Sequence, residues 1–326
     1  FAANCNLMIN YLSFFWAPAT STFWRPTIIV LIVLVLAAVN LVGIRQAAMV
    51  SNLFTIGKLI PIIIFIVAGL FFIRPEAYTF ETSPSTGAFS QSVLLLIYAF
   101  TGFEMAAIPA GEIKEPQKHL PRALLIALGV VATLYILIQV VCVGTLPELA
   151  LSTKPLADAG SKFLGAAGGA IISIGAIISI TGNLNILVLS GSRIPYAMAE
   201  QKQLPSLIGK VHASFSTPYV SIMLTAGVML FLTLKSSFVA ALTISAIARL
   251  VTYAATALAL IVLRRRSNAP DAEFNLPGGS IIATLSLILI VWLLANSTWQ
   301  EAKTAAIVAA FGLVIYAGYR FYSRSS

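Results

Sequence analysis

The chain has 326 residues, of which 59% are hydrophobic and 10% are charged, and its mean hydropathy is +0.95. One water-soluble core cannot bury that much apolar surface, so the composition excludes a soluble globular protein and predicts an all-α integral membrane protein. The formal net charge of +9 comes from lysines and arginines that are spread over the connections between apolar segments. We therefore expect the protein to lie in the lipid bilayer and to bind no nucleic acid.

Uninterrupted apolar runs of helical length divide the chain. A spanning helix needs about 20 mostly apolar residues, and the period-two alternation typical of a membrane β-barrel is not seen in this sequence. The sequence predicts nine complete transmembrane helices, at 27–44, 53–73, 88–111, 123–146, 163–190, 218–234, 238–263, 280–299 and 304–320. Residues 1–16 are also apolar, and we interpret them as the end of a partial helix whose start is missing from this chain.

The connections between these spans differ in basic charge. If alternate connections lie on opposite sides of the membrane, one side holds the larger share of lysine and arginine, including Arg45, Lys118, Arg193 and the triplet Arg264 to Arg266. The positive-inside rule places this side in the cytoplasm. We therefore expect a multi-pass protein of the cytoplasmic membrane whose C-terminus is cytoplasmic.

Three charged residues lie inside predicted spans. Of the 11 acidic residues, only Glu104 lies within an apolar run, and Lys58 and Arg249 are the two basic residues in such positions. A charge inside a membrane costs about 2.5–3.5 kcal/mol on insertion scales, so each needs a partner or an aqueous cavity. These three residues are the first functional candidates.

Lys58 lies about two turns into the predicted span 53–73, three residues before Pro61. Because buried ammonium groups lose their proton readily, one interpretation is a titrating site that couples proton movement to a transport cycle. The alternative is a lysine whose ammonium extends to the cytoplasmic surface.

Arg249 lies deeper in its span. It is roughly 21 Å from the basic triplet that ends its helix, at 1.5 Å per residue, and an arginine keeps its charge at such depth. The favoured interpretation is a structural pairing with Glu104 or with exposed carbonyl groups. Direct contact with a substrate is the alternative.

The span 88–111 contains a weak helical segment, AFTGF, from Ala99 to Phe103. Thr101 can bond its own backbone, and Gly102 tolerates dihedral angles that other residues avoid. Transporters use broken helices to present carbonyls, amides and helix-dipole ends to a solute. The segment therefore favours a break in the helix near Tyr98 and Phe100, and the alternative is an unbroken helix in which Gly102 allows close packing.

Polar residues recur in the span 163–190. Ser179, Thr181, Asn183 and Asn185 lie in a segment that is otherwise rich in Ile, Leu and Gly. Hydroxyl and amide groups inside a membrane commonly form hydrogen bonds between helices, and a cation site is the alternative.

The two ends of this region carry further signals. The glycines of GAAGG, at 165–169, predict close packing within the span. The segment 193–204 is amphipathic and bounded by Pro195 and Pro205, which predicts a short interfacial or re-entrant helix.

Four motifs occur in an order that resembles the amino acid–polyamine–organocation (APC) superfamily of transporters. YAFTGFE, followed by GEIKEPQKHLPRAL, is similar to that family's broken sixth helix and the loop after it. VNLVGIRQAAMVSNLFTIGKLIP resembles the junction of the fourth and fifth helices, and LSGSRIPYAMAEQKQLP the end of the eighth. RRR followed by FNLPGG resembles the connection between the tenth and eleventh helices, so the matches extend over essentially the whole chain.

The resemblance implies a LeuT-like inverted-repeat helical bundle of twelve helices. The first residue would fall within the third helix, so the first two helices and part of the third would be absent from this chain. Within a single transmembrane domain over 1–326, residues 1–73 would be the remainder of the first repeat, 88–263 the second repeat and 280–322 the two C-terminal helices.

The resemblance also implies where an amino acid substrate would bind. The unwound segment would contact the substrate through its backbone, Tyr98 would cover the site, and Glu104 would lie beside it. The substrate-binding candidates are Tyr98, Ala99, Phe100, Thr101, Gly102 and Glu104.

A second set of residues is implied for proton coupling. Lys58 matches a lysine that, in proton-coupled relatives, puts its ammonium where sodium-coupled relatives hold a sodium ion. Ser179 and Thr181 align near the hydroxyl groups that face this lysine. We therefore expect protons as the coupling ion, with no metal and no cofactor.

These residues predict a secondary active transporter that moves amino acids by proton-coupled symport and alternating access. An exchanger of amino acid and product is the alternative, and a non-transporting amino acid sensor is less favoured. An intramembrane enzyme would need paired carboxylates, a metal cluster or a nucleophile beside a base. This chain has one intramembrane acid, and His119 and His212 both lie in connections, so the sequence predicts that it is not an enzyme. The sequence predicts no particular oligomeric state.

Overall fold

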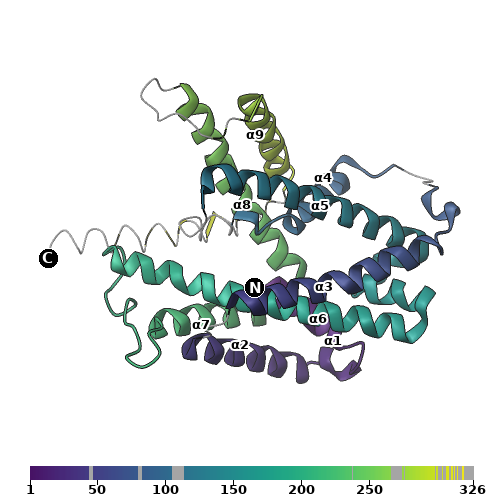
Figure 1. Cartoon of the computed structure of the whole chain (residues 1–326), viewed down its shortest axis with the longest axis horizontal. Helices are drawn as coiled ribbons and strands as arrows, with labels where there is room; N and C mark the ends of the chain where they lie inside the picture. Colours follow the sequence, from purple (N-terminus) through teal and green to yellow (C-terminus); the bar gives the residue numbers. More distant parts are fainter. Residues whose placement is uncertain are drawn as a thin grey trace. The chain divides into compact units, whose positions relative to one another are not determined.

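The structure is a computed structural model of the whole chain (Figure 1). It describes residues 1–43, 47–79, 83–104, 114–236, 238–265, 274, 276–297 and the separate positions 299, 303, 306, 307, 310, 312, 314 and 318, with only the backbone for 47–56 and 240. These residues form helices and turns and contain no β-strand, so the predicted all-α fold is confirmed for the described part of the chain.

The described residues contain nine α-helices and three short 3-10 helices. The α-helices are α1 (Ala2–Leu12), α2 (Trp24–Val42), α3 (Ala47–Leu70), α4 (Thr86–Ala99), α5 (Pro116–Thr145), α6 (Pro155–Glu200), α7 (Tyr219–Lys235), α8 (Phe238–Arg265) and α9 (Gly279–Ala295). The 3-10 helices are η1 (Ala17–Thr20), η2 (Pro75–Tyr78) and η4 (Leu149–Leu151). Helices α2 to α9 follow the order of the first eight predicted spans, which confirms that order. Most of the span 304–320, and residues 105–111 of the span 88–111, lie outside the described residues.

Several helices are suited to a membrane. By length and composition, four can cross one: Trp24–Val42, Pro116–Thr145, Pro155–Glu200 and Ala241–Arg265. Four more are apolar but shorter, namely Gly57–Leu70, Thr86–Ala99, Tyr219–Lys235 and Gly279–Ala295. The chain is thus a multi-pass membrane protein.

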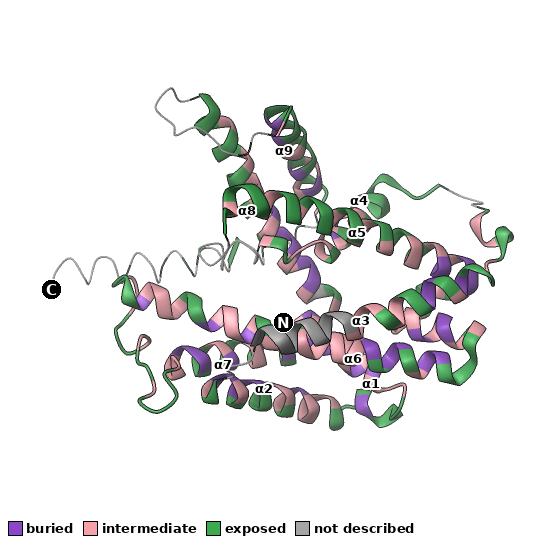
Figure 2. Ribbon diagram, viewed as in Figure 1, coloured by how far each residue is buried: buried purple, intermediate pink, exposed green. Residues whose placement is uncertain are grey.

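Helix α2 buries one face and exposes apolar side chains on the other (Figure 2). In α2, Ile29, Val33 and Leu36 are buried, whereas Leu31 and Leu34 are exposed. The buried residues recur every three or four positions and form one stripe. The exposed apolar face is what a helix presents to lipid, because lipid tails are as apolar as leucine.

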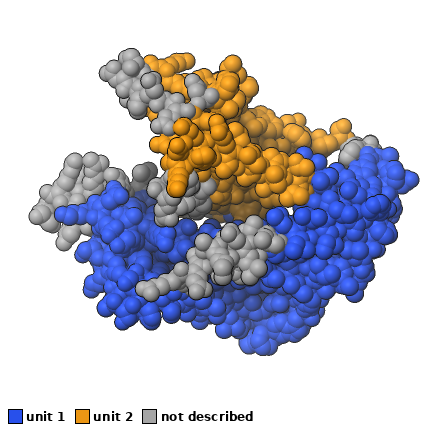
Figure 3. Space-filling model, viewed as in Figure 1, with its two compact units in different colours: residues 1–79, 136–241, 311–326 blue, residues 80–135, 242–310 orange. Residues whose placement is uncertain are grey.

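The chain divides into two compact units (Figure 3). Unit 1 contains residues 1–79, 136–241 and 311–326, and unit 2 contains residues 80–135 and 242–310.

Helix α6 contacts four helices of unit 1, namely α1, α2, α3 and α7. Its residues Leu184 and Val188 belong to a buried cluster with Cys5 and Ile9 of α1 and Ile29 of α2. Since its neighbours lie on several sides, α6 is the helix around which this unit packs.

Helix α6 is interrupted near its start. Gly165 has φ 66° and ψ −167°, a conformation open essentially to glycine alone, and it separates a short first segment from the long remainder. Gly169 packs closely, since a Cβ there would lie 2.6 Å from the Phe14 ring. The prediction of close packing is therefore correct for Gly169 and wrong for Gly165, which makes a break.

The C-terminal end of α6 also differs from the prediction. The structure continues α6 through Pro195 to Glu200, so 193–204 is no separate interfacial helix. Proline lacks only its own N–H and clashes with the preceding turn, which a long helix can accommodate by a local bend.

Unit 2 has a core made by α4, α8 and α9. Leu94 of α4, Ala246 and Leu250 of α8, and Ile290 and Leu293 of α9 form its buried cluster. Tyr98 and Tyr253 are partly buried and pack against this cluster. This core fixes the end of α4 beside the middle of α8.

Candidate functional site

Helix α4 ends at Ala99, inside the apolar run that was predicted to break. Phe100 is the C-cap residue with φ −94° and ψ 1°, and Gly102 follows with φ 109°. A positive φ of this size is accessible to glycine without strain and disfavoured for other residues. The alternative of an unbroken helix through Gly102 is therefore excluded.

The turn after α4 satisfies its own backbone. The Thr101 hydroxyl donates to the Tyr98 carbonyl at 2.8 Å, and the Thr101 N–H donates to the same oxygen at 3.1 Å. The Tyr135 hydroxyl donates to the Ala99 carbonyl at 3.0 Å, and its ring meets Phe100 edge-on at 5.3 Å. Carbonyls at a helix end need such partners, because no further turn of helix supplies them.

Glu104 folds back onto this turn. One of its carboxylate oxygens, Oε2, accepts the Gly102 N–H at 2.9 Å and the Tyr253 hydroxyl at 3.2 Å. The other oxygen, Oε1, forms an ion pair with the Arg249 guanidinium. The Phe103 and Tyr253 rings stack at 5.7 Å beside the pair. The structural pairing of Arg249 that the sequence favoured is thus confirmed.

The charged pair is partly shielded. The Arg249 side chain is 25% exposed and that of Glu104 is 32% exposed. A charge pair with this degree of burial is screened less than a surface pair, and each charge depends on the other for compensation. The carboxylate of Glu104, neutralised by Arg249, therefore lies just beyond the end of α4, where the backbone is no longer helical.

Two residues beside this turn, Tyr253 and Tyr135, were not predicted from the sequence. Tyr253 is four residues after Arg249 on α8, so both side chains lie on one helix face, and this spacing could have identified it. Tyr135 is a tyrosine in an otherwise apolar run, and its hydroxyl needs a hydrogen-bond partner where the surroundings are apolar. No sequence signal pairs Tyr135 with Ala99 specifically.

Lys58 lies in α3 of unit 1, on a half-buried face. A Cβ on Gly175 of α6 would lie 2.8 Å from Pro61, and Phe65 contacts Phe163 at 5.4 Å between ring centroids. Later residues of α3 therefore meet earlier residues of α6, so the two helices run antiparallel. Among the described residues, none forms a hydrogen bond or ion pair with the Lys58 ammonium.

The helix register relates Ser179 to Lys58. Ser179 is one turn beyond Gly175 on α6, and Lys58 is one turn before Pro61 on α3. In antiparallel helices these positions lie at the same level. Thr181 is engaged elsewhere, since its hydroxyl donates to the Ile177 carbonyl at 2.8 Å and lies 3.9 Å from the Met8 sulfur of α1.

The asparagines of α6 join neighbouring helices. Asn4 of α1 donates to Asn183 at 3.2 Å, and Asn40 of α2 donates to Asn185 at 2.9 Å. The prediction of interhelical hydrogen bonding is confirmed for these two residues.

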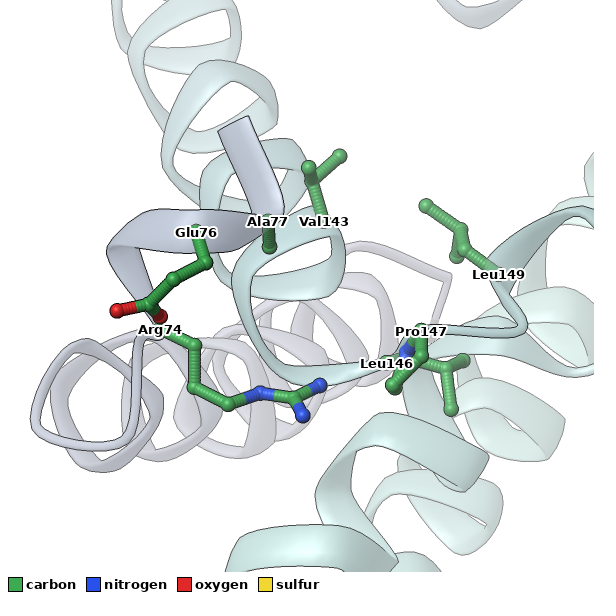
Figure 4. Close-up of a pocket in the computed structure, with 7 residues that line it drawn as sticks. All are labelled: Arg74, Glu76, Ala77, Val143, Leu146, Pro147 and Leu149. Atoms are coloured by element: carbon green, nitrogen blue, oxygen red, sulfur yellow. The ribbon is translucent and has the colours of Figure 1, made fainter. Parts of the chain in front are cut away.

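Two cavities lie in unit 1 at the loop that follows α3. One, of about 430 Å³, is lined by Arg74, Glu76, Ala77, Val143, Leu146, Pro147 and Leu149 (Figure 4). Figure 4 shows the Arg74 guanidinium directed toward Leu146 and Pro147, and the Glu76 carboxylate directed away. The second, of about 260 Å³, is lined by Phe72, Arg74, Thr145, Pro147, Lys162 and Phe163. Neither cavity is lined by a residue predicted for the substrate or coupling site.

The chain matches a known protein family and several characterised relatives. The family is described as "Amino acid permease" and matches residues 1–317. The serine/threonine exchanger SteT of Bacillus subtilis (strain 168) is 31% identical over 298 residues, or 89% of this chain. The methylthioribose transporter and the branched-chain amino acid permease BcaP of the same organism are 28% and 25% identical, each over 87% of this chain.

These relatives are longer than this chain. The matched part covers 68% of SteT and 62% of each of the other two proteins. All three are named as transporters, in agreement with the expectation that this chain is not an enzyme.

Proposed function

Because this chain belongs to the amino acid permease family, we propose that it forms most of the membrane domain of a secondary active transporter for amino acids. The transporter works by alternating access in the cytoplasmic membrane, and an inward proton gradient drives uptake. The observation that carries this proposal is the end of α4 at Ala99, where a turn and a charged cluster interrupt an apolar segment.

The turn after α4 suits the two charged groups of an amino acid. A carbonyl oxygen of the turn has two lone pairs and can accept from an α-ammonium. The N–H groups of Phe100, Thr101 and Gly102 already donate within the turn, so in the proposed site an α-carboxylate replaces one of their present acceptors. Gly102 has no side chain to block approach to this backbone, and nothing lies within 4 Å of where its Cβ would be. In the proposed site the substrate contacts the segment from Ala99 to Gly102, Tyr98 covers it, and Glu104 lies beside it.

Lys58 is the proposed coupling residue. It carries an ammonium on a half-buried helix face, and its level on α3 matches that of Ser179 on α6. A carrier couples two ligands when protonation and substrate binding favour the same conformation. Protonation of Lys58 would shift the balance between outward-open and inward-open states, with Ser179 and Thr181 on the helix opposite.

The proposed architecture is the LeuT-like inverted repeat, with 1–73 in the first repeat, 88–263 in the second, and a cytoplasmic C-terminus. Lysine and arginine are more frequent in every second connection between the spans, and this supports the proposed orientation. Single cysteines placed at Lys202 and at Lys154, in a background without Cys5 and Cys142, test it. Membrane-impermeant maleimide should label position 154 in intact cells and position 202 only after permeabilisation.

The decisive experiment is uptake of radiolabelled solutes by the full-length protein in liposomes, with and without an inward proton gradient. The panel contains L-serine, L-leucine, L-lysine, L-glutamate and methylthioribose, the last because one relative is named for it. Lys58→Ala is compared with Lys235→Ala, which removes an exposed lysine at the end of α7. Gradient-driven amino acid uptake should persist in the Lys235 variant and be lost in the Lys58 variant.

Exchange is the second candidate function, because the relative SteT is a serine/threonine exchanger. Uptake that ignores the proton gradient but requires internal amino acid would establish exchange and remove the coupling role of Lys58. Uptake of methylthioribose alone would overturn the amino acid assignment. Binding without any flux would indicate a sensor.

A further inference from the structure

The substrate-site cluster of unit 2 consists, among the residues that the structure describes, of Gly102, Phe103, Glu104, Arg249 and Tyr253, and these carry one formal negative and one formal positive charge. The negative charge is on Glu104 and the positive charge on Arg249, and they are in direct contact. Their immediate neighbours Gly102, Phe103 and Tyr253 contribute an amide, a ring and a ring with a hydroxyl group. The cluster as a whole is therefore electrically neutral, although it holds a carboxylate.

We propose that Arg249 sets the substrate class of the transporter, because its charge cancels that of Glu104 and so restricts the site to amino acids with uncharged side chains. This inference rests on the proposed function, since it assumes that the substrate binds at the end of α4. It adds a specificity-determining residue on α8, and its direct partner is Glu104. Arg249 acts through the charge of that partner and need not touch the substrate.

The geometry explains why one residue controls this property. Glu104 Oε2 already accepts two hydrogen bonds, from the Gly102 N–H and the Tyr253 hydroxyl. Its Oε1 faces Arg249. An additional cation, such as the ammonium of a lysine substrate, would find Oε1 occupied and would meet the positive guanidinium. A cationic substrate is therefore rejected by repulsion as well as by the lack of a free acceptor.

Removal of Arg249 leaves the cluster with a net negative charge. In Arg249→Gln the carboxylate stays fixed by the Gly102 amide and the Tyr253 hydroxyl, while Oε1 loses its counter-charge. A partly buried carboxylate without a counter-charge is costly, and a cationic side chain on the substrate can replace the missing guanidinium. The variant should therefore accept L-lysine.

Removal of Glu104 has the opposite effect. In Glu104→Gln the Arg249 guanidinium remains charged, because arginine does not lose its proton in proteins. The cluster then carries one net positive charge and favours L-glutamate. The double variant Glu104→Gln/Arg249→Gln removes both charges and restores neutrality, so it should again prefer uncharged side chains.

The test measures uptake of L-serine, L-lysine and L-glutamate by the full-length transporter in liposomes at pH 8, at which carboxylates are ionised. For Arg249→Gln the lysine-to-serine uptake ratio should rise about tenfold, and for Glu104→Gln the glutamate-to-serine ratio should rise about tenfold. The double variant should return both ratios to within about threefold of the parent. Arg249→Lys, which keeps the charge, should leave both ratios unchanged.

The matched control is Arg265→Gln at the end of α8, which removes an exposed arginine of the same helix. A parent that takes up serine and lysine equally well would overturn the inference, and so would variants whose ratios stay at parental values. Both outcomes leave the proposed function intact, whereas a parent with no amino acid uptake rejects the proposed function itself. If Arg249→Gln fails to fold, Glu104→Gln decides the question, because the inference predicts a higher glutamate-to-serine ratio in this variant and a purely structural role predicts no change in substrate preference.

Discussion

Arg249 in the middle of α8 forms an ion pair with Glu104, which lies just beyond the end of α4. The two residues come from different predicted spans and carry opposite charges that neither span could hold alone at low cost. The pair therefore links a helix end to a continuous helix within unit 2.

The first prediction concerns the stability that this pair supplies. Arg249→Met and Glu104→Gln should each lower the free energy of unfolding by about 1–3 kcal/mol, because each leaves a partly buried charge or acceptor without its partner. The double variant should cost less than the sum of the single variants. A double-mutant cycle on thermal unfolding in detergent measures the coupling, and strictly additive losses would show that the two side chains do not interact.

The second prediction concerns the turn after α4. Gly102→Ala should destabilise the protein by about 1–3 kcal/mol, because φ 109° is strained for any residue with a Cβ. Nothing lies within 4 Å of the added methyl group, so the cost is conformational and not a clash. Gly87→Ala in α4 is the control, since its Cβ also meets nothing and its φ is not positive. Equal melting temperatures for both variants would contradict the assigned backbone geometry.

The third prediction concerns the contact between α3 and α6 near Lys58. A Cβ on Gly175 would lie 2.8 Å from the Pro61 ring, so Gly175→Ala must push the helices apart at a cost of about 1–3 kcal/mol. Gly227→Ala in α7 adds the same atom where nothing lies within 4 Å, and it should cost nothing. If the level of Lys58 against α6 matters for coupling, proton-driven uptake should fall in the first variant alone. Unchanged stability in Gly175→Ala would argue against this helix contact.

The fourth prediction concerns the loop that carries η2. The Tyr78 hydroxyl donates to the Val140 carbonyl of α5 at 2.6 Å, and the Arg74 N–H donates to the Gly144 carbonyl at 3.0 Å. Tyr78→Phe should therefore cost about 1 kcal/mol of unfolding free energy. Tyr219→Phe removes a hydroxyl that bonds no described residue, and it should leave the melting temperature unchanged. Loss of the same stability in both variants would show that the Val140 bond contributes nothing specific.

The positions of the helices were predictable because a segment buried in the membrane must be helical. Long apolar runs must form helices to satisfy their backbone groups in lipid, so the positions of these runs in the sequence predict α2 to α9 in their observed order. The break after Ala99 was predictable for the same reason, since Thr-Gly in such a run is a weak helical segment and Gly102 supplies the positive φ.

Other features depend on tertiary contacts that the sequence does not display. GAAGG contains three glycines of similar appearance, yet Gly165 breaks the helix and Gly169 receives the Phe14 ring. The sequence predicts a boundary at Pro195, but the helix continues through it to Glu200. Likewise, the register of α3 on α6 follows from the Pro61 contact with Gly175, and composition does not reveal it.

The asparagine pairs of α6 have a consequence for how the protein assembles. An amide without a partner in lipid is costly, so α6 is a poor candidate for lasting existence alone in the bilayer. Its partners Asn4 and Asn40 belong to helices that leave the ribosome earlier than Asn183 and Asn185. The order of synthesis thus places each donor in the membrane before its acceptor on α6 is made, so these two hydrogen bonds form only after α6 has been inserted beside α1 and α2.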